Sequence, residues 1–111
     1  MFTKEINPFP VSDRIRFRNI DKTLTLTVKG AASPMIIALK MAQERLSALT
    51  DDSTDEDRLD AAKAFAKAIF GDTQAEQLLE FYNNDSLTVI SVCGQYFSNR
   101  LGKKITKAQE R

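Results

Sequence analysis

The strongest constraint on the fold is a pair of short segments in which apolar and polar residues alternate. Residues 14–20 alternate arginine with isoleucine and phenylalanine, and residues 23–29 alternate threonine and lysine with leucine and valine. A period of two turns one side of an extended segment toward a core and the other toward water. Only Asp21 and Lys22 separate the segments, so the sequence predicts a β-hairpin over 14–29 with a tight turn.

Residues 1–13 precede the hairpin and are expected to form an extended, irregular arm. Pro8 and Pro10 lack backbone N–H donors and favour extended geometry in the residues before them. Phe2 and Phe9 are apolar side chains through which this arm could contact a neighbouring surface.

Residues 34–101 change to the spacing of helices. Ser33-Pro34 is typical of a helix start, and the apolar residues that follow are spaced by four, three, four and three positions. These residues are Met35, Leu39, Ala42, Leu46 and Leu49, and Ile36, Ile37 and Ala38 widen the stripe. The stripe predicts a first helix of roughly four turns that faces a core, and its width could also serve a second subunit.

Three further helices are expected before residue 102. Thr54 or Asp55 would cap the second helix, and Gly71 would end it. Thr73 and Glu76 match a capping box for the third helix. Asp85 or Ser86 would cap the fourth; residues 87–93 are rich in β-branched residues, so a strand is the alternative there, but the apolar spacing continues for about four turns and favours a helix.

These expectations describe an α+β protein with one domain over residues 1–111. Its parts are the arm 1–13, the hairpin 14–29, the helical part 34–101 and a basic tail 102–111. A content of 42% hydrophobic and 28% charged residues is typical of a folded chain of this length.

Several kinds of chemistry have no residues to carry them. The chain has no histidine, so it lacks the commonest general base and the commonest metal ligand. The single cysteine, Cys93, lies in an apolar helical pattern that predicts burial. A calcium loop starting at Asp51 would need glycine and glutamate where Glu56 and Ala62 stand. Glu76 and Glu80 lie one turn apart, as on a solvated helix face. We therefore expect no enzyme activity, no metal and no cofactor.

The charge is close to balanced overall but unevenly distributed. Residues 51–60 contain six acidic residues against one arginine, and residues 98–111 contain five basic residues against one glutamate. These segments read as a solvated loop and a solvated tail, or as complementary patches that orient subunits or partners. No run of about 18 apolar residues predicts a membrane helix, and a single cysteine is typical of the cytoplasm.

The segment Ala68-Ile69-Phe70-Gly71-Asp72-Thr73-Gln74-Ala75-Glu76-Gln77-Leu78-Leu79-Glu80-Phe81-Tyr82 resembles a phrase found in tail-assembly chaperones of long-tailed bacteriophages and prophages of Gram-positive hosts. In that family a helix ends at Phe-Gly and an acidic–apolar helix follows. The resemblance extends loosely over residues 14–101, and its sharp part is about these 15 residues. A generic helix–turn–helix would also produce the same phrase.

The resemblance implies a non-catalytic chaperone of the bacterial cytoplasm that binds the tape-measure protein and recruits tail-tube subunits. Its contact surface would use apolar residues left over after the core is filled. The candidate partner-binding residues are Phe2, Phe9, Ile36, Ile37, Phe81 and Tyr82. Self-association is compatible with the same surface.

Two other functions remain open. A nucleic-acid-binding accessory protein could use Arg14, Arg16 and Arg18 with the basic tail, although the lysines of that tail have no interleaved aromatic residues. A phage structural or head–tail connector subunit could use the same apolar surface as a chaperone.

Overall fold

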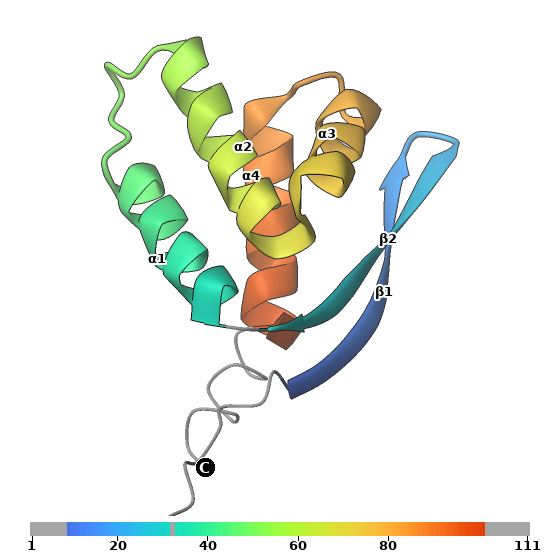
Figure 1. Ribbon diagram of the computed structural model, residues 1–111. Coiled ribbons are helices and arrows are strands. Elements are labelled where there is room, and N and C mark those ends of the chain that lie inside the picture. Colours follow the sequence, from blue (N-terminus) through green and yellow to red (C-terminus); the bar gives the residue numbers. More distant parts are fainter. Residues whose placement is uncertain (1–8, 32, 102–111) are drawn as a thin grey trace, which may run out of the picture.

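The computed structural model describes residues 9–31 and 33–101, which form a two-stranded antiparallel sheet followed by four α-helices (Figure 1). The expected α+β class is therefore confirmed, and residues 87–93 are helical. The elements are β1 (Phe9–Asn19), β2 (Lys22–Ala31), α1 (Ser33–Ser47), α2 (Asp55–Phe70), α3 (Asp72–Phe81), α4 (Ser86–Tyr96) and a closing π-helical turn (Phe97–Leu101).

The hairpin is longer than the sequence predicts and turns one residue earlier. Strand β1 begins at Phe9, so the last part of the expected arm is strand. Asn19 pairs with Lys22, which places Ile20 and Asp21 in the turn. Ile20 has a φ of 58°, a conformation that β-branched residues rarely adopt, and this is why alternation alone misplaced the turn.

A β-bulge interrupts the ladder near the start of β1. The register shifts between Phe9 and Ser12, so that two residues, Pro10 and Val11, stand opposite Gly30. Proline has no N–H to donate to a ladder, and bulges are where a strand accommodates it.

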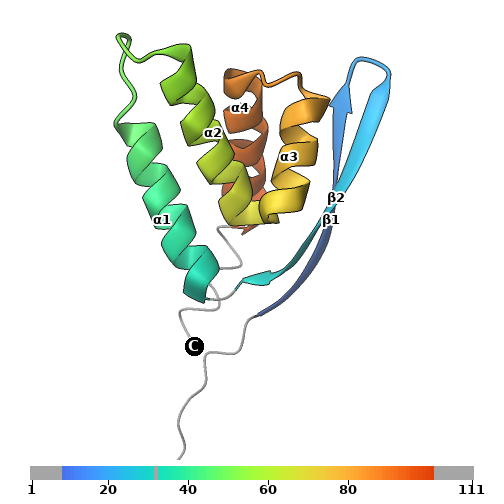
Figure 2. The same ribbon diagram turned by 45° about the horizontal axis from the view of Figure 1, so that its top comes forward.

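The hairpin lies beside the helices, and α2 is the central helix (Figures 1 and 2). The apolar face of the hairpin is turned inward. Ile15, Phe17, Leu26 and Val28 are all buried on that face. Phe70, at the end of α2, joins the sheet to the helices through aromatic rings. Its ring centroid lies 5.8 Å from that of Phe17 and 6.0 Å from that of Tyr96. Aromatic side chains bury large areas, so this cluster contributes strongly to the packing of the sheet on the helices.

The helix ends show which predicted caps form. Thr54 caps α2, and with Asp57 it completes a capping box in which each side chain accepts the other's backbone N–H. Asp85 caps α4 as expected, and its hydrogen bonds to Thr88 lower the pKa of its carboxyl group. The sequence prediction of a Thr73–Glu76 capping box is wrong.

Gly71 takes the place that Thr73 was expected to hold. It ends α2 and begins α3 at once, with a φ of 82° that suits glycine. Helix α3 therefore starts at Asp72, Thr73 lies inside its first turn, and no side chain caps this end.

Candidate functional site

Helix α1 carries more apolar residues than its packing partner covers. It packs against α2, with Leu39 and Ala42 buried. Ile37 and Met41 are 59% and 62% exposed. Residues four apart on a helix are neighbours on one face, so these two side chains form one apolar patch.

The patch borders a shallow groove between α1 and α2, which we call the α1–α2 groove. The groove has a volume of about 520 Å³. Its apolar lining consists of Met41 and four alanines, and its polar rim carries both signs of charge. The alanines are Ala38, Ala42, Ala64 and Ala68, and the charged residues are Arg45, Asp60, Lys63, Lys67 and Asp72. Small side chains let another backbone approach closely, so the groove suits a helix with an apolar stripe and a polar border.

The groove continues toward the sheet through a second hollow of about 630 Å³. Lys67 and Ala68 line both hollows, and the second also reaches Met35 of α1 and Thr27 and Val28 of β2. The two hollows therefore adjoin at Lys67 and Ala68 of α2.

The predicted partner-binding residues are not brought together on one surface. Ile36 is half-buried against the core, and Ile37 is exposed. Phe81 and Tyr82 lie at the other end of the helical layer, at the end of α3. Figures 1 and 2 both place α2 between α1 and α3, so the residues of α1 and α3 belong to separate regions.

Tyr82 and Phe81 take part in the packing of the hairpin. Tyr82 is only 8% exposed, and its hydroxyl donates a hydrogen bond of 3.0 Å to the carbonyl oxygen of Arg18. Burial, with a smaller contribution from Cys93, raises the pKa of the Tyr82 hydroxyl. The Phe81 ring is half-buried 4.9 Å from the Tyr82 ring, and its carbonyl accepts from the Asn19 side chain at 2.8 Å. Both residues thus pack against the hairpin and do not form a free surface.

The two candidate residues of the N-terminal arm have different positions. Phe9 is the first residue of β1 and pairs with Ala31. Phe2 lies outside the described residues, as do the basic residues from 102 onward.

Cys93 is buried in α4, as its helical pattern predicts. Burial raises the pKa of its thiol to about 12. The thiolate is the reactive form of cysteine, so this side chain stays a neutral apolar group near pH 7.

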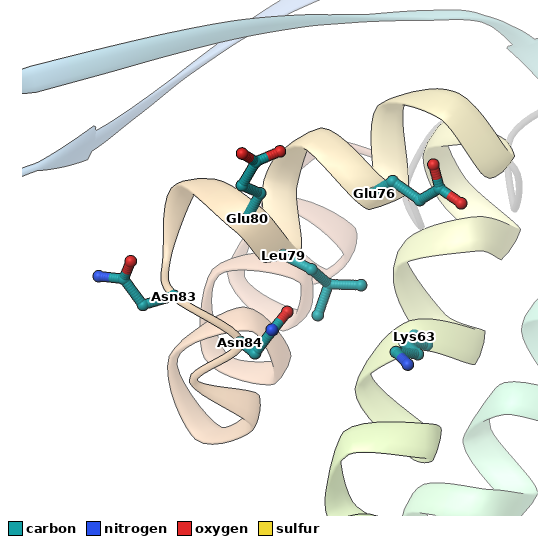
Figure 3. Close-up of a pocket in the computed structure, with 6 residues that line it drawn as sticks. All are labelled: Lys63, Glu76, Leu79, Glu80, Asn83 and Asn84. Atoms are coloured by element: carbon teal, nitrogen blue, oxygen red, sulfur yellow. The ribbon is translucent and has the colours of Figure 1, made fainter.

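A hollow of about 390 Å³, with polar residues at most of its lining positions, lies between α2 and α3 (Figure 3). Figure 3 shows Glu76 and Glu80 along one side of α3, with Lys63 on the neighbouring helix. No ion pair within 4.0 Å joins Lys63 to either carboxylate in the described chain. Both glutamates are exposed, which is the arrangement of a solvated helix face.

Over residues 9–31 and 33–101, no group of three or more histidine, cysteine, aspartate or glutamate side chains is placed to hold a metal ion. Among the helices described, none has the length and apolar character needed to cross a bilayer.

Sequence reasoning missed two residues that define surfaces. Met41 is four residues after Ile37, and this second apolar spacing on α1 was the available signal for an exposed patch. Gln74 forms three hydrogen bonds that join α3 to β2 and α2, and nothing in its sequence neighbourhood indicates them.

Comparisons with protein-family models, with curated proteins and with solved structures found no match to this chain.

Proposed function

We propose that this protein is a non-catalytic assembly chaperone that holds a helical segment of a partner protein on α1 and in the α1–α2 groove. The observation that carries the proposal is the exposed pair Ile37 and Met41 beside a groove lined by alanines. An apolar patch next to a groove with a polar rim is typical of a helix-binding surface.

The strength expected of this contact fits a chaperone. Complete burial of a large apolar side chain contributes about 1.5–3 kcal/mol. Ile37 and Met41 are already partly covered, so each would contribute less. Such a contact is weak for a single copy, and the total binding becomes strong when many copies bind along one long partner. Each single copy can then still dissociate, as a chaperone must.

The resemblance of residues 68–82 to phage tail-assembly chaperones supplies the identity of the proposed partner, a tape-measure protein, with tail-tube subunits as the proteins recruited. Within this segment Phe70, Leu78 and Leu79 are buried. The resemblance therefore supports a shared way of joining α2 to α3, and the binding role is assigned to α1 on physical grounds. The proposed location is the cytoplasm of the bacterial host.

The test is co-expression with the candidate tape-measure protein, followed by size exclusion with light scattering. We expect a soluble complex with several copies of this chain per partner. The double variant Ile37→Asp/Met41→Asp should release the partner. Leu87→Asp is the matched control, because Leu87 is 67% exposed on α4, away from the groove.

The opposite result would be a monomer that elutes apart from the partner, or a double variant that binds as well as the Leu87→Asp control. A structural subunit that used the same surface would be found by mass spectrometry in finished particles. A chaperone would be absent from them.

A further inference from the structure

The two outer edges of the hairpin differ in what covers them. On the β2 edge, the Thr27 N–H donates to the Gln74 side-chain oxygen at 2.9 Å, and the Gln74 side-chain nitrogen donates to the Thr27 carbonyl at 2.8 Å. The Gln74 amide thus makes the two bonds that a third strand would make. The β2 edge is closed at this point.

The register shows which groups of β1 point outward. In an antiparallel pair, alternate residues turn their N–H and C=O away from the partner strand. Thr27 turns outward and pairs with Arg14, so Arg14, Arg16 and Arg18 of β1 turn outward as well. The Arg18 carbonyl accordingly accepts the Tyr82 hydroxyl.

The backbone groups of Arg14 and Arg16 are the open part of this edge, which we call the β1 edge. Neither residue's N–H or C=O forms a hydrogen bond outside the hairpin ladder with any residue that the structure describes. The bulge and Pro10 lie nearer the start of the strand and leave this stretch regular. An open, regular edge is a template for another strand.

A groove of about 260 Å³ lies beside the β1 edge, between β1 and α4. Its lining is mixed: five residues are aliphatic or aromatic and three are polar. They are Ile15, Phe17, Tyr82, Val92 and Tyr96, with Arg16, Gln95 and Asn99. An added strand would direct every second side chain to the same side as Ile15 and Phe17, into this groove.

The other side chains of an added strand would lie on the outer face of the hairpin, which is basic. Arg14, Arg16 and Arg18 are exposed there, opposite Thr27, Thr25 and Thr23 of β2. None of these arginines has an ion pair within 4.0 Å among the described residues. Their spacing of about 6.6–6.8 Å matches that of alternate residues in any added strand.

This charge selects the occupant. A second copy pairing through its own β1 would place arginine against arginine, which is destabilising in a sheet. The basic residues near the C-terminus of this chain carry the same sign. A segment with carboxylates at alternate positions would instead pair with each arginine.

We propose that the β1 edge binds an extended acidic segment of a partner protein as a third strand. Its carboxylates pair with the arginine row and its intervening apolar side chains enter the groove over α4. This site is separate from the α1–α2 groove and does not depend on the proposed chaperone function.

The first experiment uses the full chain and a fluorescent peptide of alternating glutamate and valine, measured by anisotropy at low salt. Three probes accompany it: the same peptide with alternate backbone nitrogens methylated, its lysine–valine counterpart, and a fluorescent single-stranded DNA. We expect binding of the glutamate peptide and a loss on the order of tenfold or more for the methylated and lysine forms.

Two matched variants test the arginine row with the same peptide. Arg16→Gln should weaken binding by about three- to tenfold, whereas Lys40→Gln, which removes the same charge from the exposed face of α1, should leave it unchanged. Equal binding of the methylated peptide would overturn the proposal, because charge without backbone pairing would then explain the result. Tighter binding of the DNA would also overturn it and assign the arginines to phosphates.

Amide exchange followed by NMR provides a readout that charge alone would not produce. On peptide binding, the amides of Arg14 and Arg16 should exchange more slowly, while those of Ile15 and Phe17, already in the ladder, should change little. Uniform protection along β1, or none, would contradict strand addition. Thermal melts of both variants confirm that each is folded.

Discussion

Helices α1 and α2 lie side by side and have nearly the same length, yet they play different parts in the molecule. Helix α2 has 16 residues and contacts all three other helices and β2. Seven of its residues are buried: Ala61, Ala62, Phe65, Ala66, Ala68, Ile69 and Phe70. Helix α1 has 15 residues and buries Leu39 and Ala42, while Ile37 and Met41 face outward.

The difference follows from position and not from composition. The apolar residues of α2 find partners on almost every side, so the helix is a scaffold. Among the described elements helix α1 packs mainly against α2, and its apolar stripe is wider than that contact. Surplus apolar surface on a peripheral helix is where a partner can add stability without disturbing the core.

The largest loss of stability is expected from a cavity in the core where α2 meets the hairpin. Phe70→Ala should lower the free energy of unfolding by about 3–5 kcal/mol, because it removes a buried ring that contacts Phe17 and Tyr96. Urea denaturation followed by circular dichroism measures it. Phe81→Ala is the matched control, since its ring is only half-buried. Equal losses in the free energy of unfolding for the two variants would contradict the central role of α2.

A smaller loss is expected where α2, α3 and the hairpin meet. Gln74→Ala should cost about 1–3 kcal/mol, because it leaves the Thr27 N–H and C=O and the Phe70 carbonyl without their side-chain partner. The same denaturation experiment applies. Gln77→Ala on the exposed face of α3 provides the control, and a Gln74 variant as stable as that control would show that water replaces the amide at no cost.

The parts of this fold that sequence reasoning could predict are those encoded by periodicity. The alternation of Ile15 and Phe17 with arginine defined the buried face of the hairpin, and helical spacing identified α4 despite its β-branched residues. Both patterns report burial of a whole face, which local sequence encodes directly.

The features that the sequence did not predict depend on tertiary contacts. Thr73 and Glu76 match the capping-box pattern, but Gly71 is both the C-cap of α2 and the N-cap of α3. Thr73 therefore lies inside α3, where there is no helix end for it to cap. Helical spacing places Tyr82 on the inward side with Leu78, but it does not show that the hairpin returns over α3 to receive the Tyr82 ring and hydroxyl. The width of the apolar stripe made Ile37 a candidate contact residue, but which residues of the stripe stay exposed depends on what packs against α1 among the described elements.

The cap that forms and the cap that was predicted can be compared directly. Thr54→Ala should cost about 1 kcal/mol, because its hydroxyl accepts the Asp57 N–H at the start of α2. Thr73→Ala should have no cost, since Thr73 lies inside α3 and alanine is the better helix former. Thermal melts of the two variants measure the difference, and a larger loss at Thr73 would reverse the assignment of caps.

The smallest effect on stability is expected at Ile37, because an exposed side chain used for binding contributes little to folding. Ile37→Ala should change the free energy of unfolding by only about 0.5 kcal/mol, because the side chain is largely solvated and alanine favours the helix. Leu39→Ala, two residues away and buried, should cost about 2–5 kcal/mol. If Ile37→Ala is as damaging as Leu39→Ala, α1 resembles α2 and has no surplus surface. If it leaves the fold intact but weakens capture of the helical partner, then α1 differs from α2 because its outward face is used for binding.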